Sequence, residues 1–339
     1  MMQAPVFWSR SRKAPGFLPR LLSPLSRVWQ IATQRRLRLG AWEKMPVPVI
    51  CVGNLTAGGT GKTPAVCMLV AKLQALGQTP HIVSRGYGGS EEGPVQVDLA
   101  KHVAGQVGDE PLLLAAFAPT WVSRDRAAGI KAAALAGAGV VVLDDGFQNP
   151  GVFKDLSIVV IDAYAGFGNG RVIPAGPLRE ALEPGLARAD LLLSIGGETA
   201  QRRLSEDWPE TAHYPRQNAR LTPLETGMDW QGQRLLAFAG IGRPEKFFAT
   251  LEQTGATVVG KRSFPDHAEY SATVLQRLQA EAGMARAQLV TTEKDAVRLP
   301  PSVRSTVLVL PVRLESDDWS VLDVTLTQLT LGKDHATNR

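Results

Sequence analysis

Residues 49–64 read VICVGNLTAGGTGKTP, and this stretch decides the fold. An apolar run enters a loop that contains Gly58, Gly59 and Gly61, and Lys62-Thr63 leads into a predicted helix over 64–76. A strand, a glycine-rich loop and a helix in this order bring backbone N–H groups and a helix N-terminus to one point. The stretch therefore predicts a phosphate-binding loop (P-loop), with a ligand-free glycine turn as the alternative.

The loop departs from the usual pattern Gly-x-x-x-x-Gly-Lys-Ser/Thr, because Thr56 stands in the first place. Gly58 and Gly59 supply the backbone freedom instead. We expect Lys62 to contact the β- and γ-phosphates of ATP and the Thr63 hydroxyl to bind Mg²⁺. The residues predicted to bind the nucleotide are Thr56, Ala57, Gly58, Gly59, Thr60, Gly61, Lys62 and Thr63.

Apolar runs alternate with helical patterns along the body of the chain. This alternation predicts an α/β fold of the P-loop NTPase class, with a doubly wound, mostly parallel sheet. The pattern restarts near residue 234 and predicts a second, smaller α/β domain. We expect a basic arm over 1–44, a P-loop core over 45–197, a connection over 198–232, the smaller domain over 233–331 and a tail over 332–339.

Charge is unevenly distributed along the 339 residues. The net charge is +5, but residues 1–44 hold nine basic residues and one acid, so the remainder carries −3. A mildly acidic body argues against a broad nucleic-acid-binding face, and no nucleic-acid partner is expected. The two cysteines, Cys51 and Cys67, lie in apolar stretches and are expected to be reduced core residues.

The arm predicts an amphipathic helix, which Pro24 would bend or break. No uncharged stretch in it approaches the roughly 18 residues of a membrane span, and it has no apolar region typical of a secretory signal. A helix in a membrane surface, with arginines toward anionic headgroups, is the favoured interpretation. A helix packed on the body and a transit peptide are the alternatives. The predicted apolar face comprises Leu18, Leu21, Leu22, Leu25, Val28, Trp29 and Ala32.

An acidic pair follows the predicted strand over 140–143. Asp144 and Asp145 would lie at its C-terminal end, which is the edge where α/β proteins bind ligands. Asp144 is the candidate Mg²⁺ ligand, and turn chemistry before Gly146 is the alternative interpretation of the pair. The loop lacks the signature lysine of the partitioning ATPases, whose place is taken by Ala57.

Eight ordered sequence blocks resemble the tetraacyldisaccharide 4'-kinases, the lipid A 4'-kinases of Gram-negative bacteria. The resemblance runs from about residue 17 to 331. The blocks are GNLTAGGTGKTP (53–64), SRGYGG (84–89), GDEPLLLA (108–115), DDGFQN (144–149), GNGRVIPAGPLRE (168–180), FAGIGRPEKFF (238–248), FPDHAEY (264–270) and TTEKDAVRLP (291–300).

The resemblance implies an enzyme that transfers the γ-phosphoryl of ATP, with Mg²⁺, to a 4'-hydroxyl. The acceptor is an acylated glucosamine disaccharide 1-phosphate, and the product is lipid IVA. It implies a peripheral, monotopic protein at the cytoplasmic face of the bacterial inner membrane, where the arm meets an anionic membrane surface. We expect the protein to act as a monomer.

The resemblance also assigns roles to residues. It makes Asp109 the catalytic base and His267 its partner, and Lys62 and Asp145 complete the catalytic set. Because Asp109 and His267 lie in different halves of the chain, the two domains must close on each other. Glu110 is a further candidate Mg²⁺ ligand. A helix cap at Asp109 and a loop position without a role at His267 are the alternatives.

Five polar residues are candidates for binding the substrate. Arg85 follows a predicted strand, where it is suited to a phosphate, with a surface ion pair as the alternative. The others lie in the irregular segment 168–180, which suits a hydroxylated headgroup: Asn169, Arg171, Arg179 and Glu180. Two rival functions remain open here, a P-loop ATPase switch of the partitioning type and a kinase for a soluble sugar.

Overall fold

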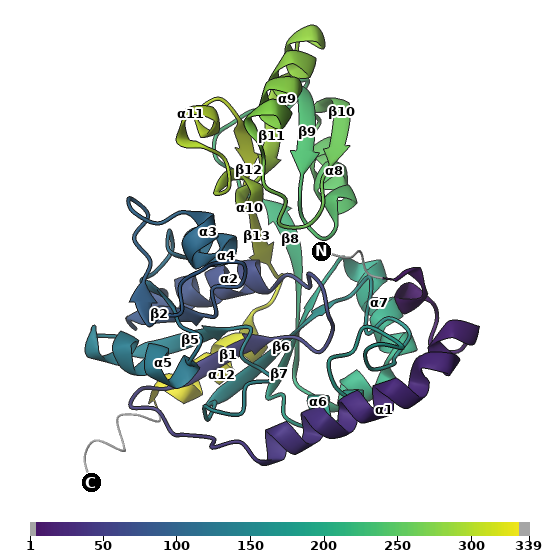
Figure 1. The fold of residues 1–339 in the computed structure, drawn as a ribbon, viewed down its shortest axis with the longest axis vertical. Coiled ribbons are helices and arrows are strands. Elements are labelled where there is room, and N and C mark those ends of the chain that lie inside the picture. The colour runs from purple at the N-terminus through teal and green to yellow at the C-terminus, as the bar shows by residue number, and fades with distance from the viewer. Residues whose placement is uncertain (1–4, 332–339) are drawn as a thin grey trace.

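The protein contains two β-sheets, one in each of two units. The computed structural model describes residues 5–331, so the expected tail over 332–339 lies outside the described residues. A nine-stranded sheet forms the larger part, and a four-stranded sheet stands above it (Figure 1). The P-loop NTPase-type α/β fold with a large, mostly parallel sheet is confirmed, and so is a second α/β unit.

The P-loop strand lies at the centre of the large sheet. Strand β1 (Val49–Gly53) pairs in parallel with β5 (Val140–Asp144) on one side and β6 (Leu156–Asp162) on the other. The C-terminal ends of these strands therefore meet at one edge. Outside β5 lie β2 (Pro80–Ser84), β4 (Thr120–Val122) and the antiparallel β3 (Val95–Gln96). Outside β6 lie β7 (Leu191–Ile195), β8 (Arg216–Pro223) and the antiparallel β13 (Val312–Glu315).

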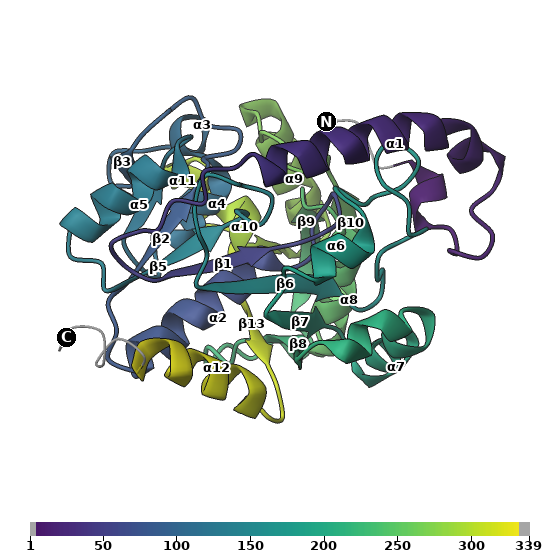
Figure 2. The same ribbon diagram turned by 90° about the horizontal axis from the view of Figure 1, so that it is seen from below.

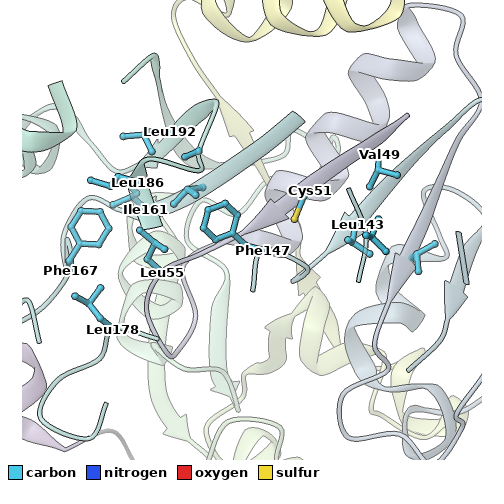
Figure 3. Close-up of a cluster of buried hydrophobic side chains, with 14 of the residues drawn as sticks. Val49, Cys51, Leu55, Leu143, Phe147, Ile161, Phe167, Leu178, Leu186 and Leu192 are labelled. Atoms are coloured by element: carbon cyan, nitrogen blue, oxygen red, sulfur yellow. The ribbon is translucent and has the colours of Figure 1, made fainter. Parts of the chain in front are cut away.

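Helices bury both faces of this sheet, which explains why its central strands are apolar throughout. Helices α2 (Lys62–Ala75) and α12 (Ser320–Leu331) cover one face, and α5 (Arg126–Leu135) and α6 (Leu182–Leu186) cover the other (Figure 2). Figure 3 shows the hydrophobic core on the face that α5 and α6 cover, which includes Cys51, Leu55 and Phe147. Cys51 and Cys67 are free, buried thiols, as predicted, and burial raises the pKa of each to about 12.

The smaller sheet is wholly parallel, in the order β10–β9–β11–β12. Its strands are β9 (Arg234–Ala239), β10 (Thr257–Ser263), β11 (Gln288–Thr292) and β12 (Leu308–Leu310). Helix α8 (Pro244–Gln253) packs its phenylalanines on one face, and α9 (Ala272–Met284) packs its leucines on the other. The short helices α10 (Glu293–Ala296) and α11 (Pro301–Arg304) complete this smaller unit, which we define as residues 234–310.

The expected domain boundaries differ from the observed strand pairing. Strand β8 falls in the expected connection, yet it pairs with β7 in the large sheet. Strand β13 and helix α12 fall in the expected smaller domain, yet they also belong to the large unit. The chain crosses between units twice, side by side, where the Leu224 N–H donates to the Pro311 carbonyl at 2.9 Å. Strand β8 lies near the sheet edge and is half polar, so its sequence lacks the apolar run of a buried strand.

Helix α1 (Phe17–Arg38) is one unbroken helix along the outside of the large unit (Figures 1 and 2). The break considered at Pro24 does not occur, because Pro24 is exposed and the carbonyl that it leaves unpaired can bond to water. The helix rests on the body through its small side chains: the Ser26 hydroxyl donates to the Val172 carbonyl at 2.7 Å. Three members of the predicted apolar face, Leu21, Leu25 and Val28, are not packed on the body, since they are 59–66% exposed.

Three further helices lie between these elements. They are α3 (Ala104–Val107), α4 (Asp109–Leu114) and α7 (Glu198–Asp207). Helix α4 begins where the smaller unit faces the large sheet, and it contacts α10 of that unit. No helix within residues 5–331 is both long enough and apolar enough to cross a membrane.

Candidate active site

The second half of the P-loop, residues 58–61, is open and faces the smaller unit. Gly58 and Gly61 adopt positive φ angles of 110° and 93°, which the chain reaches easily only at glycine. A Cβ atom at Gly58 or Gly59 would meet nothing within 4 Å, so space for a ligand lies in front of them. The Thr60 hydroxyl is buried without a hydrogen-bond partner among the described residues. An unpaired buried donor in a glycine loop at a helix N-terminus suits a phosphate oxygen.

The first half of the P-loop is bound to the segment 171–179. The Ala57 N–H donates to the Pro177 carbonyl at 2.8 Å, and the Arg179 N–H donates to the Leu55 carbonyl at 2.8 Å. Thr56 forms an isolated bridge with Leu178. The expectation that the Ala57 amide binds phosphate is therefore not met in this structure, because that amide is already satisfied. Strand-like pairing at Thr56 also explains why a glycine is not needed there.

The acidic pair lies beside the P-loop, as its place after β5 predicts. Burial, Glu110 and Asp145 together raise the pKa of Asp144 to about 7, although the Ser84 hydroxyl donates to it at 3.0 Å. Asp145 adopts a φ of 49° and turns the other way, toward Lys62 at 3.7 Å and Arg179 at 3.1 Å. Burial would raise the pKa of Asp145, but Lys62 and Arg179 outweigh it and hold that pKa below its usual value.

Asp109 and His267 meet across the two units, although 158 positions separate them. His267 Nδ1 lies 2.8 Å from Oδ2 of Asp109 and 3.0 Å from Oδ1. Asp109 is the first residue of α4 and is only 5% exposed. Burial would raise its pKa, but the His267 contact, Lys294 and Arg298 outweigh burial and lower it. This buried carboxylate therefore stays ionised at neutral pH.

Two cations at the same junction were missed by the sequence analysis. The Lys294 ammonium donates to Glu110 at 3.2 Å, and Arg298 Nε lies 3.9 Å from Asp109. Both come from the block TTEKDAVRLP, which was noted only as a part of the resemblance. Their position after β11 at the C-terminal edge of the smaller sheet was the signal that could have identified them.

Asp295 holds the loops that carry these groups. This fully buried carboxylate accepts from the Tyr270 hydroxyl at 2.6 Å, from the Gly240 N–H at 2.9 Å and from Arg298. The Gly240 carbonyl in turn accepts from the His267 N–H at 3.1 Å. His267 has a positive φ of 60°, which is uncommon for a residue with a side chain. The bonds around Asp295 and Gly240 hold it in that conformation.

A second contact between the units lies on the other side of the P-loop. Asp162, at the end of β6, pairs with Arg243 at 2.7 Å and with Lys246 at 2.8 Å, both from the smaller unit. A Cβ atom built on Gly242 would lie 3.8 Å from the Gly59 nitrogen. The smaller unit therefore stands directly over the glycines of the P-loop and is held on both sides of it.

Arginines gather at the edge beyond Asp144. Arg85 is exposed, and Arg126 is buried with its Nε unpaired among the described residues. Burial and the nearby charge of Arg85 both lower the pKa of Arg126. The two guanidinium groups repel each other, and an anion bound between them would offset this repulsion.

Within the segment 168–180 the predicted residues divide into two groups. Asn169 is buried, and its amide donates to the carbonyls of Phe7 and Ala175 at 3.1 and 2.9 Å. Glu180 is buried and paired with Arg188. Neither side chain is free to contact a sugar, so the expectation of substrate contact is corrected to a supporting role for both. Arg171 is bonded to Ser23 of α1 at 2.9 Å, and Arg179 to Asp145.

The chemistry of the donor set fits a magnesium ion that is shared with phosphates. Among residues 5–331 no group of three or more His, Cys, Asp or Glu side chains is arranged to hold a metal unaided. Mg²⁺ usually takes one or two carboxylates and completes its shell with phosphate oxygens and water. Burial, together with the nearby charges of Glu110 and Asp145, raises the pKa of Asp144, and a divalent cation would stabilise its ionised form.

Comparisons with known proteins give one family name throughout. The family model for tetraacyldisaccharide-1-P 4'-kinase matches residues 18–330. The chain is 55% identical over 329 residues to the tetraacyldisaccharide 4'-kinase of Dinoroseobacter shibae, covering 97% of this chain and 98% of that one. It is 53% identical over 322 residues to the enzyme of the same name from Jannaschia sp., covering 95% and 97%. The apo-form LpxK of Aquifex aeolicus in complex with ATP superposes with a TM-score of 0.75 at 27% identity, covering 92% and 99%.

Proposed function

The chain belongs to the tetraacyldisaccharide-1-P 4'-kinase family, and on this premise we propose how its residues carry out the transfer. The protein is an ATP-using kinase of lipid A biosynthesis that phosphorylates a lipid disaccharide at its 4' position. The observation that carries the residue-level proposal is the contact between Asp109 and His267. This contact brings a buried, ionised carboxylate of one unit and an imidazole of the other to the edge that bears the P-loop.

The open half of the P-loop binds the phosphates of ATP in this proposal. The amides of residues 58–61, the unpaired Thr60 hydroxyl and the Lys62 ammonium surround the β- and γ-phosphates. Thr63, Asp144 and Glu110 would hold Mg²⁺ together with phosphate oxygens, and the ion would neutralise charge on the transferred group. Asp145 positions Lys62, since it lies between that ammonium and Arg179.

Asp109 acts as the general base. It accepts the proton of the 4'-hydroxyl as the oxygen attacks the γ-phosphorus, and the bond from that phosphorus to the bridging oxygen of ADP breaks. The lowered pKa of Asp109 keeps its carboxylate unprotonated at neutral pH, so that it can accept a proton. All these groups come from one chain, which supports the proposal that the enzyme acts as a monomer.

The headgroup of the lipid lies against Arg85, Arg171 and Arg179 in this proposal. Arg85 stands beside the buried Arg126, a pairing suited to the substrate's 1-phosphate or to a phosphate of ATP. Arg171 and Arg179 link the site to α1, because the Ser23 hydroxyl accepts from Arg171 and the Trp29 indole donates to the Arg179 carbonyl.

We propose that α1 lies in the surface of the inner membrane, at its cytoplasmic face, as a peripheral anchor. The apolar residues that α1 exposes include Phe17, Leu18, Leu21, Leu25, Val28, Trp29 and Ile31. Five arginines of the same helix are also exposed, and they suit anionic headgroups. The helix is bonded to the segment 171–179, so a lipid drawn from the membrane would reach the site along that segment.

A transfer assay tests this proposal. Purified full-length protein is given γ-labelled ATP, Mg²⁺ and the disaccharide 1-phosphate in detergent micelles, beside Lys62→Ala and His267→Ala. The proposal predicts label on the lipid, with a loss of orders of magnitude in Lys62→Ala and a clear loss in His267→Ala. Label released only as free phosphate, whether or not lipid is present, would instead indicate the ATPase switch.

A further inference from the structure

Lys294 lies at the centre of the junction between the two units. It is the second residue of α10, and its side chain is 19% exposed. Its ammonium nitrogen lies 3.3 Å from Nε2 of His267, 3.2 Å from Oε1 of Glu110 and 3.7 Å from Oδ1 of Asp266. It therefore faces the ring nitrogen of His267 on the side opposite to Asp109.

The chemistry of these partners allows one arrangement of protons. A lysine ammonium has three donors and no acceptor, so a ring nitrogen at bonding distance from it must accept. His267 Nε2 is therefore unprotonated, and the single ring proton lies on Nδ1. There it donates to Asp109, whose oxygens lie 2.8 and 3.0 Å away. The two contacts of His267 are both satisfied only in this tautomer.

Asp266 is the competing partner for Nε2. Its Oδ1 lies 3.8 Å from Nε2 and has no hydrogen-bond partner within the described part of the chain. This distance is too long for a hydrogen bond, whereas the Lys294 contact is within range. Tyr87 also packs against the ring edge-on, at 5.9 Å between centroids. Loss of Lys294 would leave a carboxylate as the nearest polar group to Nε2.

We propose that Lys294 is a positioning residue that holds neutral His267 in the tautomer with its proton on Nδ1, an inference whose catalytic consequence rests on the proposed role of Asp109 as base. The Nδ1 proton stabilises and orients the Asp109 carboxylate, which then presents an oxygen to the 4'-hydroxyl.

The tautomer can be read directly by ¹⁵N NMR of the full-length protein with labelled histidine. The His267 signals are assigned by their loss in His267→Ala. In the wild type we expect a protonated Nδ1 and an unprotonated Nε2. In Lys294→Met we expect a proton on Nε2, directed at Asp266, whereas Lys294→Arg restores a donor-only group and the wild-type pattern. A wild-type spectrum with a proton on Nε2, or an unchanged pattern in Lys294→Met, would overturn the inference.

Kinetics provide the second readout. We expect kcat to fall about 10- to 100-fold in Lys294→Met, less than loss of the base itself costs, and to recover largely in Lys294→Arg. Lys246→Met is the matched control, because it also removes a lysine that bridges the two units but does not contact His267. It should keep the wild-type NMR pattern, and a tautomer change in this control would also overturn the inference.

The two readouts separate this inference from the proposed function. If Asp109→Asn retains activity while the NMR pattern still responds to Lys294, the proposed base is wrong but the control of the tautomer stands. If Asp109→Asn abolishes transfer while the pattern ignores Lys294, the base stands and the inference fails.

Discussion

A buried carboxylate that stays ionised is the central feature of this protein at the scale of single residues. Asp109 is removed from water, which alone would raise its pKa, yet His267, Lys294 and Arg298 surround it with donors and positive charge and lower that pKa. All three belong to the smaller unit, and they lie near Asp109 only because the two units are docked. The acceptor is therefore assembled by tertiary structure and does not exist in either unit alone.

Asp109→Asn tests this acceptor with little change of shape. The amide cannot take up the hydroxyl proton, so we expect kcat to fall about 10²- to 10⁴-fold with little change in the KM for ATP. Steady-state kinetics with the lipid substrate measures this, and circular dichroism with a thermal melt checks folding. A folded Asp109→Asn variant within a few-fold of wild-type kcat would contradict the assignment.

Lys154 gives a prediction about pH and stability. Burial lowers its pKa to about 8 from the usual 10.5, and its ammonium stands 4.5 Å above the ring of Trp42. Between these two values the unfolded chain holds the proton and the folded chain does not, so the Lys154 contribution to the free energy of unfolding rises with pH across this window. Below about pH 8 the folded protein keeps the Lys154 ammonium buried, and the full free-energy cost of burying that charge remains.

Lys154→Met removes this dependence. The stability of the variant relative to the wild type should decrease from about pH 7 to about pH 10, because only the wild type gains from deprotonation. Urea unfolding of both proteins at the two pH values measures the difference between their free energies of unfolding. Titrating groups that the two proteins share cancel in this difference. A difference that stays constant or grows with pH would show that Lys154 keeps an ordinary pKa.

At the scale of elements, α1 is the helix whose apolar side the fold leaves uncovered. It attaches to the body through Ser26, Thr33 and Pro19, which are its buried residues, and not through its leucines. This inverts the usual arrangement, in which the apolar side of a surface helix faces the core. The inversion motivates the membrane proposal, since an exposed apolar side of this extent marks an interaction surface.

Replacing Leu21, Leu25 and Val28 by serine should weaken binding to anionic vesicles strongly. Each buried side chain of this size contributes about 1.5–3 kcal/mol to burial, and these three are already exposed in the protein alone. The melting temperature should therefore stay the same while vesicle flotation falls. Leu135→Ser is the matched control, because Leu135 on α5 is 91% exposed and lies outside the arm. Equal flotation of the triple variant and the wild type would refute the membrane role of α1.

At the scale of the whole molecule, two units are joined by two crossing segments and held by contacts on both sides of the P-loop. On one side lie Asp109, Glu110 and their partners, and on the other lies Asp162. A hinge between the units would lie at the crossings beside Leu224 and Pro311. Closure of the units over ATP would exclude water and so suppress hydrolysis relative to transfer.

Asp162→Asn should loosen this closure without touching the chemistry. It weakens the ion pairs with Arg243 and Lys246, and a loss of one to two kcal/mol shifts the balance toward open forms about 5- to 30-fold. We expect a larger radius of gyration in small-angle X-ray scattering and a lower kcat, because His267 meets Asp109 less often. Asp317→Asn, which breaks an exposed pair within the larger unit, is the control. An unchanged radius of gyration in Asp162→Asn would argue against a latch at this position.

The strands and helices of the sheet core were predicted closely because their patterns are local. The P-loop needs a strand, glycines and a helix that are adjacent in sequence, and the strand predicted over 140–143 lies within β5 (Val140–Asp144). Strand β8, which lies next to the edge strand β13, was missed because a half-exposed strand lacks the apolar run that identifies a buried one. The roles expected for Ala57, Asn169 and Glu180 changed because their hydrogen-bond partners lie far away in sequence or in another element.

The sequence by itself determined the P-loop, the parallel sheet and the amphipathic arm, which follow from spacing and residue chemistry along short stretches of chain. Its resemblance to the kinase family implied the roles expected for Asp109 and His267. Only the tertiary structure decided that Lys294 faces His267, that Asp162 holds the smaller unit and that the leucines of α1 point away from the body. The physical reason is that charge pairing and burial depend on distances between atoms, and folding alone brings segments that are remote in sequence within a few ångströms.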